Sequence, residues 1–188
     1  MSDTTAETAR RAAARAKELG IKHLVVASNT GTTALTLAEA VDQAYGPDNP
    51  SRPSISCVTH VTGFRNPGEQ EMPQEVRERL HSMGIKVLTT THLMGGIERA
   101  IAREWGGLYP AAIVANTLRM FGQGSKVAVE CAVMALDSGL IPYGEEVISL
   151  GGSGRGADTA LVVRPSHAAS FFKTAVLEVV TKPRKGAE

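Results

Sequence analysis

The chain has 188 residues, of which 43 % are hydrophobic and 21 % charged, as is ordinary for a globular protein with a buried core. Its net charge of +1 and aromatic content of 4 % argue against nucleic-acid binding, because such proteins use clustered positive charge and stacked rings. No apolar run approaches the roughly 20 residues of a membrane helix and the N-terminal segment lacks the apolar core of a signal peptide, so we expect a cytoplasmic protein without a membrane partner.

Helical and strand patterns alternate along the chain. Helix-forming stretches, several opened by proline or ended by glycine, predict helices at residues 6–19, 32–43, 73–83, 95–105, 110–121 and 125–138. Short valine-rich runs predict strands at residues 23–28, 54–60, 85–92, 145–150 and 159–164, and residues 173–183 are a candidate for a last strand.

This alternation predicts an α/β fold, a three-layer αβα sandwich whose sheet is mostly parallel. The last step differs, because between Leu150 and Thr159 there are too few residues for a helical crossover, which needs a dozen or more. We therefore expect an antiparallel strand near the C-terminus. With neither an internal repeat nor a linker in the sequence, residues 1–188 are predicted to form a single domain.

The segment SNTGTTA (residues 28–34) follows the first predicted strand and opens a helix. Hydroxyl groups and exposed backbone N–H groups at the start of a helix suit a phosphate. The alternative is that these hydroxyls only cap the helix. The segment lacks the Gly-Lys-Ser/Thr of a phosphate-binding Walker loop, and it is not a dinucleotide fingerprint.

Two Thr-His pairs, at His60 and His92, follow consecutive predicted strands, so both imidazoles are placed to face one cleft. We expect ligand contact by hydrogen bonds or stacking, with satisfaction of loop carbonyls as the alternative. A metal site with Glu69 or Glu71 is not favoured, because no helix-spaced ligand pair is present. No disulfide is expected, since both cysteines lie in apolar segments and the expected compartment is reducing.

Three further acidic positions have two interpretations each. Glu69 and Glu71 precede a helix, where acids are favoured, and could instead hold sugar or ribityl hydroxyls. Glu130 lies among apolar residues and is either a perturbed carboxylate or part of an exposed helix edge.

The segment GGSGRGAD (residues 151–158) joins two predicted strands, and no helix starts there. We interpret it as a chain reversal that is also a ligand flap, in which the glycines let the backbone approach a ligand and Arg155 supplies the charge. Its Ser153 does not stand in a nucleophile elbow, and no Ser-His-Asp order is present, so a phosphatase or other hydrolase is the weakest hypothesis.

Taken together, four segments of the chain resemble a known family. They are VVASNTGTTAL, VTHVTGFRNPGEQEM, THLMGGIERAI and the long block from TLRMFGQGSKVAVECAVMALDSGLIPYG to EEVISLGGSGRGADTALVVRP. It comprises small proteins related to the C-terminal domain of pyruvate kinase that occur without the catalytic barrel, and the resemblance covers residues 5–183. It implies a pyruvate kinase C-terminal domain-like fold with flavin mononucleotide (FMN) as the associated cofactor. It does not imply pyruvate kinase activity, because that active site belongs to another domain.

The resemblance also implies a set of cofactor-binding residues in three loops. The phosphate would be held by Ser28, Asn29, Thr30, Gly31, Thr32 and Thr33. The glycine loop would close over the ligand with Gly151, Gly152, Ser153, Gly154, Arg155 and Gly156. From the order of the loops, we expect the ring side to be lined by His60, Gly63, Phe64, Thr91 and His92.

Two functions follow from these residues. The first is binding of a phosphorylated small molecule, FMN above all, with a flavin-dependent oxidoreductase of unknown substrate as its catalytic form. The second is a non-catalytic sensor module for a phosphorylated metabolite, like the effector role of the related pyruvate kinase domain. A strand at the sheet edge makes a homo-oligomer plausible.

Overall fold

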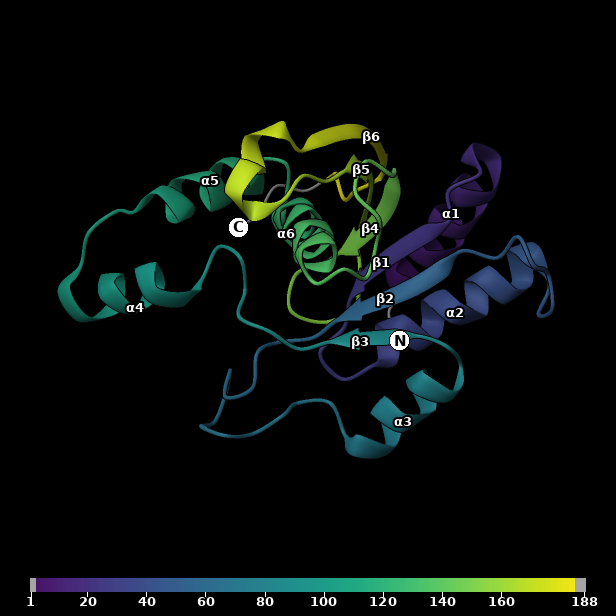
Figure 1. Ribbon diagram of the computed structural model, residues 1–188, viewed down its shortest axis with the longest axis horizontal. Helices are drawn as coiled ribbons and strands as arrows, with labels where there is room; N and C mark the ends of the chain where they lie inside the picture. The colour runs from purple at the N-terminus through teal and green to yellow at the C-terminus, as the bar shows by residue number, and fades with distance from the viewer. Residues whose placement is uncertain (1–2, 185–188) are drawn as a thin grey trace.

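The computed structural model describes residues 3–184, and Figure 1 shows the arrangement of its elements. The helices are α1 (Asp3–Leu19), α2 (Thr32–Tyr45), α3 (Gln74–Ser82), α4 (Gly96–Trp105), α5 (Pro110–Arg119) and α6 (Gln123–Asp137). The strands are β1 (His23–Ala27), β2 (Ser54–Val58), β3 (Lys86–Leu88), β4 (Val147–Gly151), β5 (Thr159–Arg164) and β6 (Ala175–Thr181). All the predicted helices and strands are therefore confirmed, including the last strand.

Some local features differ from the prediction. Strands β2 and β3 end at Val58 and Leu88, short of the predicted His60 and His92, and just beyond them the hydroxyls of Thr59 and Thr89 lie 2.7 Å apart. A short 3-10 helix, η1 (Ala168–Lys173), precedes β6, and the sequence patterns do not indicate it.

The six strands form one sheet in the order β3-β2-β1-β4-β5-β6. Strands β3, β2, β1 and β4 are mutually parallel, as the register Leu24 opposite Ile148 illustrates for β1 and β4. Strand β5 runs antiparallel to both β4 and β6. The expected α/β fold with a mostly parallel sheet and an antiparallel strand near the C-terminus is thus confirmed.

Alternation along the strands sends side chains to two apolar cores, one on each face of the sheet. Leu24 and Val26 of β1 pack in the core that contains α1 and α2, whereas Val25 packs in the core that contains α6. Each such side chain contributes about 1.5–3 kcal/mol when fully buried. Helices on both faces of the sheet make the three layers of the predicted sandwich (Figure 1).

The loops that follow β1, β2, β3 and β4 meet at one edge, because the carboxyl ends of parallel strands point the same way. Gly31, in the first of these loops, has φ of 87°, and a Cβ there would lie 2.3 Å from Val76 Cγ1 of α3. Only glycine fits this turn, so the sequence itself brings the start of α2 close against α3. Within residues 3–184, no helix combines the length and apolar character required to cross a membrane.

Candidate functional site

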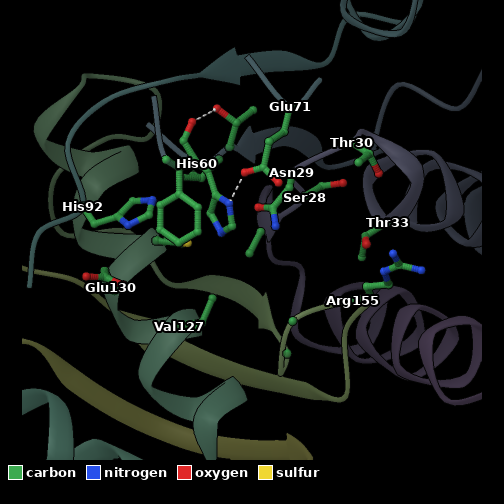
Figure 2. A pocket seen from close by; sticks show the side chains of 18 of the residues that line it. Ser28, Asn29, Thr30, Thr33, His60, Glu71, His92, Val127, Glu130 and Arg155 are labelled. Atoms are coloured by element: carbon green, nitrogen blue, oxygen red, sulfur yellow. Dashed lines mark hydrogen bonds and ion pairs between the residues drawn. The ribbon is translucent and has the colours of Figure 1, made fainter. Parts of the chain in front are cut away.

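A cavity of about 1060 Å³ opens where the four loops meet (Figure 2). This volume is slightly above the range of about 300–1,000 Å³ that small-molecule sites usually occupy. Most of the predicted site residues lie on its wall, namely Ser28, Asn29, Thr30, Thr32, Thr33, His60, Phe64, His92, Gly152, Gly154, Arg155 and Gly156.

The other predicted residues lie beside the wall and shape it through the backbone. Gly31 forms the left-handed turn before α2, and the Gly63 N–H donates to Glu69 O at 2.9 Å. Gly151 ends β4, where a Cβ would lie 2.3 Å from Gly124 O. The remaining two, Thr91 and Ser153, are exposed.

One end of the cavity is rich in hydroxyl and N–H groups. The first-turn N–H groups of Thr32 and Thr33 have no intrahelical acceptor. Ser28 Oγ accepts a long hydrogen bond, 3.4 Å, from the Ala34 N–H, whereas the N-cap residue itself, Gly31, has no side chain with which to cap. Capping by Ser28 thus satisfies only one of the free N–H groups, and the others remain open to an anion.

Arg155 lies at this same end, near the labelled side chains of Thr30 and Thr33 (Figure 2). It comes from the glycine loop between β4 and β5, which is held by the Asp158 N–H donating to Gly151 O at 3.0 Å. Among residues 3–184 no carboxylate lies within ion-pair distance of Arg155. Its positive charge is therefore available to a ligand.

The other end of the cavity holds three rings. The ring centroids of His60 and Phe64 are 3.8 Å apart, and those of His60 and His92 are 5.4 Å apart. Phe64 and His92 are separated by 5.5 Å. The predicted convergence of the two imidazoles on one cleft is therefore confirmed, and with Phe64 they form a surface suited to a planar group.

Glu71 fixes the orientation of His60. Its Oε2 is paired with His60 Nδ1, and its Oε1 lies 2.9 Å from Arg65 Nε. Glu71 therefore does more than open a helix: it is a mostly buried carboxylate on the cavity wall, with 14 % of its side chain exposed.

Burial lowers the pKa of His92 below its ordinary value. The nearby Glu130 carboxylate opposes this shift, whereas His60, Lys126 and Arg99 act in the same direction as burial. His92 is therefore neutral near pH 7, which suits hydrogen bonding or stacking better than pairing with an anion.

Glu130 is a buried carboxylate with two partners. It is 5 % exposed, forms an ion pair with Lys126 one helical turn earlier, and accepts the Met94 N–H at 2.8 Å. The interpretation as an exposed helix edge is wrong, because α6 is covered by the sheet on one side and by α5 and η1 on the other. The pair ties the β3–α4 loop to α6 and fixes the wall beside His92.

The sequence analysis missed four cations on the cavity wall: Arg65, Arg99, Arg119 and Lys126. Arg119 is held in place by Gln123 Oε1 at 2.7 Å and Asn116 Oδ1 at 2.9 Å. Lys126 and Glu130 could have been found from their four-residue spacing within an otherwise apolar helix. Arg99 and Arg119 give no such signal, because they lie in ordinary amphipathic helices.

Metal binding and catalysis by a cysteine nucleophile are poorly supported by the described residues. Within the described chain no cluster of three or more histidine, cysteine or acidic side chains is arranged to hold a metal ion. Cys57 and Cys131 are free thiols, and burial raises the pKa of Cys57 to about 12 and that of Cys131 further. Neither is therefore a ready nucleophile, although Cys131 lines the cavity.

Comparison with known proteins places this architecture in a family. Residues 6–163 match the family described as pyruvate kinase, alpha/beta domain. Similar solved structures include a pyruvate kinase from Cryptosporidium parvum, with 17 % identity, a TM-score of 0.45, and coverage of 87 % of this chain and 23 % of that one. Another is Cryptosporidium parvum pyruvate kinase in complex with ADP, with 16 % identity, a TM-score of 0.42, and coverage of 97 % of this chain and 24 % of that one.

The chain thus spans about a quarter of the length of these enzymes. The match to the family model covers most of the described residues and includes β1 to β4 and nearly all of β5. This chain belongs to the pyruvate kinase alpha/beta domain family.

Proposed function

We propose that the cavity binds FMN, with the phosphate at the start of α2 and the flavin ring against His60, Phe64 and His92. The observation that carries this proposal is the joining, within one cavity, of a cationic hydroxyl-rich end and an end lined by rings. FMN has the same division, because a ribityl chain separates its phosphate from its planar ring. The resemblance to the stand-alone flavin-associated proteins points to the same ligand.

The charges of the wall support an anionic ligand. Five basic side chains and three acidic ones line the cavity, and with neutral histidines the excess is two positive charges. Two of the basic groups, Arg65 and Lys126, are already paired with Glu71 and Glu130. A phosphate monoester carries close to two negative charges at neutral pH, and Arg155 lies beside the start of α2 to pair with it.

The chain's own residues have distinct roles in this proposal. Arg155 and the N–H groups of Thr32 and Thr33 bind the phosphate, and the glycine loop restricts access of water to it. His60, held by Glu71, packs against Phe64 at the ring end. When bound, FMN would supply any electron-transfer chemistry, and the protein would position it.

The uptake of FMN by purified protein tests the proposal. We expect FMN to be retained against dialysis, with a change in its visible absorbance and in its fluorescence. A protein that is colourless when purified and takes up no added FMN would contradict the proposal.

The sensor hypothesis has a different signature in the same preparation. A sugar phosphate would raise the melting temperature by mass action, and FMN would not. If only sugar phosphates stabilise the protein, the phosphate end is used but the ring end is not. That outcome would favour the sensor module over the flavoprotein.

A further inference from the structure

Helix α4 has no buried residue, although one side of it is apolar. Ile97, Ile101 and Trp105 recur every four residues, so they lie along one side of the helix. Ile97 is 80 % exposed and Trp105 is 77 % exposed. Figure 1 shows α4 standing apart from the sheet, at the left of the view.

The apolar surface continues beyond α4. Large exposed side chains follow on the connection to α5, on α5 itself and just after it, and we call the whole set the α4–α5 face: Ile97, Trp105, Leu108, Ile113, Met120 and Phe121. From their exposed fractions, these six side chains together present on the order of 600 Å² of apolar surface. Summed over the six side chains, this area is comparable to the largest apolar patch on a typical monomer.

A helix as short as α4 is not stable in water by itself. Isolated helices of fewer than about 12 residues are marginal even in favourable sequences, and most helical stability comes from packing of the apolar side. Within residues 3–184 the apolar side of α4 is therefore left without a covering surface.

We propose that the α4–α5 face is covered by the same face of a second copy of this chain, in a two-fold symmetric dimer. The apolar area available, of the order of 600 Å² per copy, is most of the roughly 800 Å² that each partner buries in an interface of standard size. Two-fold dimers, in which one patch meets itself, are also the commonest homo-oligomers.

The charges of α4 fit self-association. Its charged residues stand in the order Glu98, Arg99, Arg103, Glu104, so their sum is zero and the patch does not repel itself. Glu98 already accepts the Ala111 N–H at 3.0 Å and Arg99 lines the cavity, so the interface is built on the apolar side chains.

The competing surface is the edge strand β6. Val176, Leu177 and Val179 are exposed there, and an unpaired edge is able to pair with another chain. Strand β6 is, however, already stabilised by pairing with β5, whereas α4 has nothing comparable. The dimer is therefore assigned to the α4–α5 face, and β6 serves as the alternative in the test.

Light scattering after size exclusion measures the mass of the full chain and of two variants, Ile97→Glu and Leu177→Glu. Loading at about 100 µM exceeds the micromolar Kd at the weak end of such interfaces. We expect the wild type and Leu177→Glu to have twice the mass of one chain and Ile97→Glu to have the mass of one. Glutamate is favourable in the first turn of a helix, so Ile97→Glu does not disfavour α4 itself, and circular dichroism checks its fold.

Trp105 provides an independent readout, because it is the only tryptophan of the chain. We expect its emission to be blue-shifted and protected from acrylamide in the wild type and in Leu177→Glu, and red-shifted and freely quenched in Ile97→Glu. A monomeric wild type would overturn the proposal. A dimer that survives Ile97→Glu but dissociates in Leu177→Glu would overturn it too, since it would place the interface at β6.

Discussion

Replacing Arg155 by alanine tests the phosphate end of the cavity without disturbing the fold. The side chain is exposed and makes neither a hydrogen bond nor an ion pair with any residue between 3 and 184, so its removal leaves no unsatisfied partner. A hydrogen bond to a charged group contributes about 1.5–3 kcal/mol. At about 1.4 kcal/mol for each factor of ten, the loss corresponds to a roughly 10- to 100-fold weaker affinity for FMN.

Isothermal titration or quenching of FMN fluorescence measures this change directly. Arg164→Ala is the matched control, because Arg164 is also exposed but does not line the cavity. We expect the control to bind FMN like the wild type and both variants to melt at the wild-type temperature. An unchanged affinity in Arg155→Ala would show that this arginine does not contact the phosphate, and the assignment of the glycine loop as a ligand flap would be refuted.

The remaining predictions concern stability. Gly31→Ala introduces a Cβ at 2.3 Å from Val76 Cγ1 in a left-handed turn, and we expect it to destabilise the fold by about 1–3 kcal/mol in a denaturant titration, with FMN binding impaired as well. Lys126→Met leaves the buried Glu130 unpaired, which should cost about 3–5 kcal/mol, and a melting temperature that is unchanged at neutral pH would contradict this. The pKa of His92 is lowered in the folded state, so its contribution is complete above pH 6.5 and is lost as the pH falls through the folded pKa. The wild type should therefore lose more stability than His92→Gln as the pH falls below about 6.5, and equal losses in parallel thermal melts would rule out this origin.

The sheet could be predicted because its signals are local. Valine-rich runs such as those of β1 and β4 identify buried strands regardless of what packs on them. The reversal before β5 follows from loop length alone, since the connection between Gly151 and Thr159 is too short for a crossover. The loops at the carboxyl ends then follow from the parallel order, and with them most of the cavity wall.

Other features depend on packing that the sequence does not encode locally. Lys126 and Glu130 are polar residues in a helix, a pattern usual at a surface, and only the layers around α6 bury them. Arg99 and Arg119 reach the cavity because α4 and α5 lie along its rim, and nothing in their own segments indicates this orientation. The apolar side of α4 predicts a buried face, yet no residue of α4 is buried within residues 3–184.

A comparison of FMN with riboflavin is the most direct test of the central claim that the cavity holds a phosphate at one end and a ring at the other. The two molecules share the ring and the ribityl chain and differ only in the phosphate. Arg155 and the start of α2 together should contribute about 2–4 kcal/mol, so we predict that FMN binds roughly 30- to 1,000-fold more tightly. Equal affinities for the two would contradict the account, because the residues at the start of α2 and Arg155 would then contribute nothing to binding.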